Sequence, residues 1–555
     1  MHRFVALPTV IAALAISLAA CEAPETAQQE AASTSREITA QDLAHHIEIL
    51  ASDDFEGRAP GTPGGEKTVA YLTEAFKSRG AAPAFDEGYG QTVSMIEVTA
   101  TDITPLRVEG PETDLSYAYG KEMMVWTKRV VAQSAVEQSD MVFVGYGVVA
   151  PEYGWNDYAG VDVRGKTVVM LVNDPGYATQ DETLFNGRAM TYYGRWTYKY
   201  EEAARQGAAA AIIIHETAPA SYPWSVVENS WSGPQLDLQR PDNNMDRIPI
   251  EGWVTHDVAS QIMAAAGHDL RTLEAAALRR DFKAVPLGLK ASVALENSIR
   301  SAQSDNVVAM VEGSARPDEA VLYVAHWDHL GRGQPLDGDE IYNGAVDNAT
   351  GVAGLLEIAE RFANGPAPER SVIFLAVTAE ESGLLGSAHY AQQPAVPLAR
   401  TVAVLNMDAM TVSGPTKDVV VIGHGKSELE QILAAKAAQQ NRVLKPEDAP
   451  EQGFFYRSDH FNFAKRGVPA LFAEGGIEHV ERGAEWGRAQ ADDYVQNRYH
   501  KPSDEFDPNW DLSGLAEDVA LLYEVGVELA NSEAWPNWYE DAEFRAARDR
   551  SRAGL

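Results

Sequence analysis

The chain has 555 residues and a formal net charge of −36, and 45% of its residues are hydrophobic. At about 150 residues per domain, this length suggests three or four folding units with sizeable cores. The negative charge argues against nucleic acid as a partner, because phosphates would repel it. The single cysteine, Cys21, excludes a disulfide within the chain and argues against thiolate zinc ligands or a cysteine nucleophile.

The amino terminus has the pattern of an export signal. Arg3 precedes an apolar stretch over residues 4–20, and small residues stand immediately before Cys21. The final Leu-Ala-Ala-Cys resembles a bacterial lipoprotein box, which implies removal of residues 1–20 and lipidation of Cys21. Residues 21–38 would then be a flexible tether. Since no later apolar run reaches the roughly 20 residues of a membrane span, we expect attachment only through this lipid. The protein would be held in the periplasm, or at the outer membrane or surface of a bacterium.

The segment between residues 126 and 291 is rich in short strand patterns. Residues 141–149 have the pattern of a strand with a turn, and residues 165–172 that of a second strand. A helical pattern over 197–208 is followed by an apolar run over 209–214. We expect a β-rich domain inserted into a larger one, with limits placed to within about ten residues.

Three unbroken apolar runs follow, and each ends just before polar residues. They are 320–325 before His326, 371–378 before Glu380 and Glu381, and 401–405 before Asn406 and Asp408. Such runs are typical of strands that helices cover on both faces. Helical patterns over 351–362 and 427–440 lie among them, the second opening with the capping-box spacing of Ser427 and Glu430. The alternation predicts an α/β fold with a mostly parallel central sheet flanked by helices, and ligands bind beyond the carboxyl ends of such strands.

The polar residues at these strand ends suit a site for two divalent metal ions. The candidate ligands are two histidines and three carboxylates: His326, Asp347, Glu381, Asp408 and His500. Three negative charges against four positive ones leave room for one bridging hydroxide at neutrality. One carboxylate has to span both ions, and charge alone does not say which. Glu380 is left free to take a proton from a metal-bound water. Nitrogen and oxygen donors suit two zinc ions, with manganese or cobalt as alternatives.

Five stretches carry a family pattern: HWDHLG, IYNGAVDNATGVAGLLEIA, LAVTAEESGLLGSAHY, LNMDAM and YHKPSD. Together they resemble the co-catalytic zinc aminopeptidases of metallopeptidase family twenty-eight. Residues 50–72 look like the opening segment of many bacterial members, and residues 457–472 like the stretch near the substrate pocket. The resemblance runs over residues 41–529 and implies a zinc aminopeptidase (phosphorylase/hydrolase-like) fold with an inserted protease-associated domain.

The resemblance implies a role for each polar residue. His326 and Asp408 would hold one zinc, Glu381 and His500 the other, and Asp347 would bridge them. Glu380 would be the general base, and the phenol of Tyr499 would stabilise the oxyanion. Asp328 would orient the imidazole of His326, and Asp504 that of His500. Arg457, Ser458 and Asp459 would line the substrate pocket. His45, His46 and His329 fall outside the ligand set, and we expect them at the surface or in packing.

Sequence pattern and resemblance together predict five parts of the chain. They are a signal peptide (1–20), a tether (21–38), a discontinuous zinc peptidase domain (39–125 and 292–535), a protease-associated insert (126–291) and a C-terminal surface segment (536–555).

The function expected is that of an exported two-zinc exopeptidase. An aminopeptidase would hydrolyse the amino-terminal peptide bond of a peptide with a metal-bridging water and Glu380 as base. A carboxypeptidase of the glutamate carboxypeptidase type stays open, since such relatives recognise a terminal carboxylate with arginines and Arg457 is a candidate. A zinc acyltransferase like glutaminyl cyclase also stays open. A receptor-like binding module is least favoured, because every ligand position is filled.

Overall fold

The computed structural model describes residues 1–2 and 37–554. Nearly all of the predicted signal peptide and of the tether, Cys21 included, therefore lies outside the described residues. Within the described ranges, no helix is both long and apolar enough to cross a bilayer. Residues from Ile38 onward form one compact unit.

The main sheet of this unit is parallel at its centre and antiparallel towards its edges. In spatial order its strands are β2 (Gly90–Ile103), β13 (Val285–Val311), β17 (Arg370–Val377), β14 (Arg316–His326), β18 (Thr401–Asn406), β21 (Ala470–Gly475), β19 (Asp418–Val421) and β20 (Val443–Pro446). The short β1 (Ala82–Pro83) also pairs with β13. The central strands β17, β14, β18 and β21 are parallel, whereas β13 and β19 run antiparallel to β17 and β21. The three predicted strands and the α/β fold are thus confirmed.

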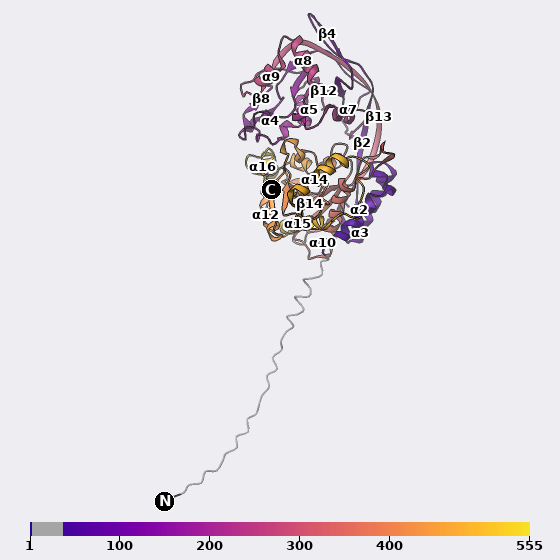
Figure 1. The fold of residues 1–555 in the computed structure, drawn as a ribbon, viewed down its shortest axis with the longest axis vertical. Coiled ribbons are helices and arrows are strands. Elements are labelled where there is room, and N and C mark those ends of the chain that lie inside the picture. The colour runs from indigo at the N-terminus through magenta and orange to yellow at the C-terminus, as the bar shows by residue number, and fades with distance from the viewer. Residues whose placement is uncertain (3–36, 555) are drawn as a thin grey trace. The chain divides into compact units, whose positions relative to one another are not determined.

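Helices cover both faces of the main sheet. Successive side chains of β14 point to opposite faces and enter two different apolar cores. Val321, Tyr323 and Ala325 belong to one apolar core, whereas Leu322 and Val324 belong to the opposite one. The first core is completed by α2 (Ala40–Leu50), α3 (Pro63–Ser78), α10 (Thr350–Asn364), α12 (Leu429–Gln439) and α15 (Ser513–Asn531). The second is completed by α11 (Leu385–Gln392), α13 (His460–Ala464) and residues of the C-terminal end. The main sheet is therefore buried between helical layers (Figure 1).

Residues 106–284, here called the middle segment, contribute apolar cores of their own. Its strands are β3 (Leu106–Gly110), β4 (Thr113–Tyr117), β5 (Met123–Trp126), β6 (Gln133–Phe143), β7 (Val149–Ala150), β8 (Trp155–Asn156), β9 (Thr167–Leu171), β10 (Ala210–His215), β11 (Pro234–Leu238) and β12 (Ile250–Thr255). Its helices are α4 (Pro175–Thr179), α5 (Trp196–Arg205), α6 (Thr217–Ala220), α7 (Trp224–Ser230), α8 (His256–Ala265) and α9 (Leu270–Ala277). β6, β9, β10 and β12 are parallel neighbours with side chains packed on both faces. The predicted strands and helix of this region are present as β6, β9, β10 and α5.

The middle segment's cores include residues before the predicted limit at 126. Leu106, Val108 and Tyr117 are buried in the same cluster as Met123 and Val125. They belong to β3 and β4, which pair with each other, and β3 also pairs with β13. The strands that carry this core thus begin about twenty residues earlier than 126.

The long strand β13 joins the two groups of elements. Its first half pairs with β6 of the middle segment, and its last residues pair with β17 of the main sheet. From Leu295 to Val307 it also pairs with β2, and Figure 1 shows these two strands side by side. The middle segment is therefore attached through a shared strand.

The start of α12 differs from the predicted capping box. The helix begins at Leu429, its N-cap residue is Glu428 rather than Ser427, and the side chain of Glu428 makes no capping hydrogen bond. The carboxylate of Glu430 instead accepts hydrogen bonds from the backbone N–H groups of Gly425 (2.8 Å) and Lys426 (3.0 Å). The prediction was wrong because the preceding loop turns back onto the helix and occupies that carboxylate.

The C-terminal end is anchored in the core, which corrects the predicted surface segment. It does contain a helix, α16 (Arg545–Arg552), but Trp538, Phe544 and Arg548 are buried. The Nη2 of Arg548 donates a hydrogen bond to the carbonyl of Thr401 (2.9 Å), the first residue of β18. The charged composition suggested solvent exposure, but a long side chain can bury its stem and still satisfy its charged end.

Candidate metal centre

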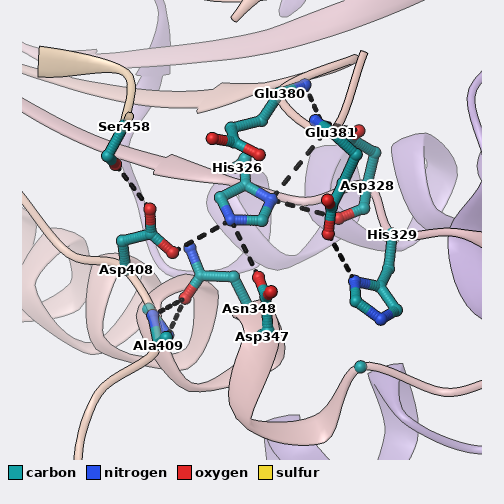
Figure 2. Close-up of polar contacts among 12 residues, drawn as sticks. His326, Asp328, His329, Asp347, Asn348, Glu380, Glu381, Asp408, Ala409 and Ser458 are labelled. Carbon is teal, nitrogen blue, oxygen red and sulfur yellow. Dashed lines mark hydrogen bonds and ion pairs between the residues drawn. The ribbon is translucent and has the colours of Figure 1, made fainter. Parts of the chain in front are cut away.

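The predicted ligands converge beyond the carboxyl ends of the central strands. Figure 2 shows four of them, His326, Asp347, Glu381 and Asp408. His326 is the last residue of β14, Glu381 follows the end of β17, and Asp408 follows the end of β18. Asp347 lies in the turn before α10, and His500 follows α14 (Gly483–Asn497). A hairpin of β15 (Gly331–Leu336) and β16 (Asp339–Tyr342) fills the chain between His326 and this turn.

Asp347 lies between two groups of side chains. On one side, the Nε2 of His326 is 3.2 Å from Asp347 Oδ1 and 3.1 Å from Asp408 Oδ1. On the other side, the Nε2 of His500 is 3.3 Å from Asp347 Oδ2 and 3.2 Å from Glu381 Oε2. Each oxygen of Asp347 thus belongs to a different group.

These separations fit a zinc site. Two donors that each lie about 2.0–2.1 Å from a tetrahedral zinc are roughly 3.3 Å apart. The measured donor separations, 3.1–3.3 Å, are close to that value. The donors are imidazole nitrogens and carboxylate oxygens, which zinc accepts readily. The residues therefore fit the predicted metal on geometry and chemistry.

The electrostatics of the cluster favour positive charge. Although burial acts to lower it, the carboxylates of Asp408 and Glu380 raise the pKa of His326 well above its usual value. Burial raises the pKa of Glu381, but nearby His500 and His329 outweigh this and lower it to about 2. Each shift shows that the clustered carboxylates attract positive charge, which a divalent ion would supply in place of protons on the histidines.

Glu380 lies beside the cluster, and among the described residues its carboxylate has no hydrogen-bond or ion-pair partner. Burial raises the pKa of Glu380 well above its usual value, against the charge of His326, and Glu381 and Asp408 add to the rise. Its backbone N–H donates to Asp328 Oδ1 at 3.0 Å, so its position relative to β14 is fixed. A partly buried carboxylate with a raised pKa is suited to accept and return a proton.

Tyr499, the predicted oxyanion stabiliser, is 42% exposed and stacks on the ring of His500. The two ring centroids are 3.9 Å apart and their planes differ by 26°. The phenol is therefore at the open side of the cluster, beside a predicted ligand.

Asp328 supports the site through two different groups. Its backbone carbonyl is 3.1 Å from His326 Nδ1, whereas its carboxylate is 3.9 Å away. The carboxylate instead accepts the N–H groups of Glu380 (3.0 Å) and Glu381 (3.4 Å). Asp328 thus fixes His326 with its carbonyl and the two glutamates with its side chain.

Asp504 does not contact the imidazole of His500 as predicted. Its buried carboxylate accepts the backbone N–H groups of Val346 (3.0 Å) and Asp347 (3.1 Å). The turn that carries Asp347 presents unpaired N–H groups, and the carboxylate satisfies them. Asp504 therefore positions Asp347 rather than His500.

Two polar side chains hold the Asp408 side of the cluster. Ser458, predicted to line the substrate pocket, donates to Asp408 Oδ2 and accepts from Asn406 Nδ2 (2.8 Å). Asn348 accepts the N–H of Ala409 at 3.1 Å and donates to the carbonyl of Met407 at 3.0 Å. The peptide bond between Asp347 and Asn348 is cis.

His329 is part of the cluster, although the sequence suggested a surface or packing residue. It is buried, and its Nδ1 is 2.7 Å from Glu381 Oε1. His329, Asp347 and Glu381 form a group with metal-ligand spacing, as do His326, Asp347 and Asp408. Its place in the HWDH motif, three residues after His326, was the available signal. By contrast, His46 is a packing residue as expected, bonded to Tyr71 (2.6 Å) and Glu357 (3.2 Å).

The other predicted pocket residues adjoin the cluster. Asp459 is fully buried, and neither oxygen of its carboxylate has a hydrogen-bond partner among the described residues. Burial raises the pKa of Asp459 to about 7. Arg457 has two buried nitrogens, Nε and Nη2, that also lack partners within the described ranges.

The chain matches known peptidases in sequence and in fold. Residues 306–523 match Peptidase family M28. Probable lipoprotein aminopeptidase LpqL of Mycobacterium tuberculosis is 23% identical over 524 residues, which cover 91% of this chain and 87% of that protein. Aminopeptidase NAALADL1 of Mus musculus is 34% identical over 137 residues, which cover 24% of this chain and 17% of that protein.

A solved structure shares the overall architecture. An aminopeptidase from Aneurinibacillus sp. strain AM-1 matches with a TM-score of 0.50 and 19% sequence identity, covering 90% of this chain and 96% of that one. At this identity the likeness concerns the fold, a large central sheet flanked by helices.

Proposed function

We propose that this chain, whose residues 306–523 belong to Peptidase family M28, is an exopeptidase that hydrolyses the amino-terminal peptide bond of peptides with the help of two zinc ions. The observation that carries the proposal is the position of Asp347, with one carboxylate oxygen in each of two ligand groups. Glu380 stands beside both groups and is bonded to neither.

The ligand assignment follows the two groups. His326 and Asp408 would hold one zinc, Glu381 and His500 the other, and Asp347 would bridge them. His329 reaches the second group through Glu381. Zinc bound there would supply Lewis acidity toward the scissile carbonyl and lower the pKa of water. Manganese or cobalt would fit the same donors.

The chain's own residues would move the proton and position the substrate. Glu380 would take a proton from the attacking water and give it to the leaving amine, for which its raised pKa is suited. The phenol of Tyr499, half-exposed at the open side of the cluster, would donate a hydrogen bond to the developing oxyanion. Asp328, Asp504 and Ser458 would hold the reacting groups in place.

We also propose export and lipid attachment through Cys21. The Leu-Ala-Ala-Cys sequence and the name of the relative LpqL both support a lipoprotein. The catalytic part would then face the periplasm or the cell exterior, where it would act on peptides. Mass spectrometry of the membrane fraction should find a diacylated amino-terminal Cys21, and Cys21→Ser should release the protein into the soluble fraction.

The middle segment is proposed to be a protease-associated domain that shapes access to the site. It has cores of its own and shares β13 with the main sheet, as an insert of this kind would.

Metal analysis combined with a peptide panel tests the proposed activity. The purified protein should contain about two zinc ions per chain by inductively coupled plasma mass spectrometry. It should cleave peptides with a free amino terminus whether the carboxyl end is free or amidated, and should not cleave their N-acetylated forms. Cleavage of N-acetylated peptides from the carboxyl end would instead favour a carboxypeptidase, and cyclisation of N-terminal glutamine without cleavage an acyltransferase.

A further inference from the structure

Glu474 is a half-buried residue of β21 whose carboxylate stands alone. Among the described residues it takes part in no hydrogen bond or ion pair. Other carboxylates that pack against this sheet are satisfied. Asp518 pairs with Arg442 (2.6 Å), and Glu543 pairs with Lys426 (3.2 Å). A carboxylate that is partly removed from water without a partner is costly, so Glu474 needs an explanation.

The register of the main sheet puts Glu474 close to the predicted metal ligand Asp408. Strands β18 and β21 are parallel neighbours, and Asn406 pairs with Phe472. Asp408 follows Asn406 by two residues, and Glu474 follows Phe472 by two residues. Neighbouring strands lie about 4.8 Å apart. Glu474 therefore leaves the sheet at the same edge as Asp408, where parallel strands place their ligands.

Glu474 also lies on the face of the sheet that carries the loop before α13. Phe472 belongs to the second apolar core and Ala473 to the first, so Glu474 shares the face of Phe472. Helix α13 packs into that second core. The residue before its start, Ser458, donates a hydrogen bond to Asp408. Glu474 is therefore on the side of the sheet from which the chain contacts the metal cluster.

The charged groups around Glu474 are acidic. Burial raises the pKa of Glu474 to about 8. The other causes of the rise are the negative charges of Asp518, Asp408 and Glu447. Glu474 is in neither group of residues with metal-ligand spacing around Asp347, so the proposed metal ions do not account for it. A cation that comes from outside the chain would be attracted to this place.

Two other carboxylates at this edge lack partners among the described residues, but for reasons that do not apply to Glu474. Glu380 is the proposed base, and a base has to keep its oxygens free. Asp459 is fully buried, so a ligand in solution does not reach it. Glu474 is only half-buried. It is thus an accessible anion beside the metal cluster, without a part in the proposed chemistry.

We infer that Glu474 binds the cationic side chain of the first residue of the substrate, so that the enzyme prefers peptides with an amino-terminal arginine or lysine. Because the amino-terminal peptide bond is the one cleaved at the metal cluster, the first residue has to lie beside that cluster. Its side chain then starts near Asp408, and a long basic side chain extends to Glu474. A carboxylate binds a guanidinium through paired hydrogen bonds and an ammonium group as a point charge. The inference rests on the proposed function, because it names the substrate class of the same site.

The test compares fluorogenic aminoacyl amides that differ in one positive charge, using the full-length, zinc-loaded protein. Citrulline has the shape of arginine without its charge, and norleucine has the four-carbon chain of lysine without the ammonium group. The arginine amide should have a kcat/KM about 10- to 100-fold higher than the citrulline amide, mainly through a lower KM, because hydrogen bonds to charged groups contribute that much. The lysine amide should exceed the norleucine amide in the same way. Either preference supports the cation site, and ratios of one or less in both pairs would overturn it.

Substitution of Glu474 tests whether this residue is the source of the preference. Glu474→Gln keeps the size of the side chain and removes its charge, so the ratio between the arginine and citrulline amides should fall at least about tenfold, through a higher KM for arginine. Glu524→Gln is the control, because Glu524 is exposed on α15, which packs into the first core. A wild-type ratio in folded Glu474→Gln would contradict the inference.

Failure of the proposed function can be told apart from failure of this inference. If no peptide or aminoacyl amide is cleaved, the peptidase assignment fails, but binding still reports on Glu474. In that case, isothermal titration calorimetry of the wild-type protein should show tighter binding of arginine amide than of citrulline amide, and Glu474→Gln should abolish the difference. Equal binding of the two ligands to the wild-type protein would overturn the cation site.

Discussion

The carboxylate of Asp504 accepts the backbone N–H of Asp347 at 3.1 Å across 157 positions of sequence. A second N–H, that of Val346, is bound by the same carboxylate. The turn that presents the shared carboxylate of the metal cluster is therefore fixed by a side chain that is not itself in either ligand group. A small displacement of Asp347 would change the geometry of both ligand groups at once.

Substitution of Asp504 should weaken metal binding at both positions. In Asp504→Asn one oxygen can still accept, but the amide NH₂ faces a backbone N–H, so the turn shifts. We expect zinc affinity to fall about 10- to 100-fold, as for other residues that orient metal ligands. Competition with a fluorescent chelator measures this, with the exposed Glu505→Gln as control. Wild-type affinity in the Asn variant would show that the turn holds Asp347 unaided.

Glu380 and Glu381 are neighbours in sequence that should respond differently to the same change. Glu380→Gln should keep its zinc and lose about 10²- to 10⁴-fold in kcat, since only the proton acceptor is removed. Glu381→Gln should lose metal from the group that contains His500 and His329. Metal content and kcat measured on the same preparations distinguish the two roles. Near-normal turnover in Glu380→Gln would rule out its role as base.

His460 should make the fold sensitive to acid. Its ring is fully buried against Phe455 and Phe472, and burial lowers its pKa to about 3 from an ordinary 6.5. Above pH 6.5 the histidine is neutral in both folded and unfolded chains and has no effect. Below pH 6.5 the unfolded chain takes up the proton and the folded one does not, so stability falls until the pH approaches 3.

The size of this effect is measurable by substitution. Between pH 7 and pH 4.5 the histidine should cost about 2–3 kcal/mol of unfolding free energy. His460→Phe, which removes the titrating group from an aromatic environment, should lose that much less stability over the same range. Urea unfolding at both pH values measures the difference, and His45→Gln at the surface is the control. Parallel pH dependences for His460→Phe and wild type would disprove the assignment.

The C-terminal end should matter for stability. Trp538 is fully buried and its indole N–H donates to the carbonyl of Gly467 at 2.9 Å. Trp538→Ala should cost about 3–5 kcal/mol, because it leaves a large cavity and an unpaired carbonyl. Thermal and urea unfolding measure the loss, with the exposed Glu540→Ala as control. A loss below about 1 kcal/mol would mean that this end packs loosely.

The sequence predicted the centre of the fold because its signals there are local. The apolar runs before His326, Glu380 and Asp408 have the pattern of buried strands, and parallel strands bring their carboxyl ends to one edge. Hence the predicted ligands and the free glutamate do come together.

Partners that depend on long-range backbone placement were not predictable. Asp504 follows His500 by four residues, which suggested a contact between them, but its partners are amide groups of a distant turn. The burial of His329 depends on close packing against Gly344, where a side chain would collide with the imidazole.

Strand β13 is a single ribbon of 27 residues with partners in both halves of the unit. An inserted domain that could be removed or exchanged would be joined on each side by a linker outside any sheet. Here the junction after the middle segment lies within β13, a strand that is hydrogen-bonded to its neighbours on both sides of that junction. Calorimetry should therefore register one joint melting event for both halves.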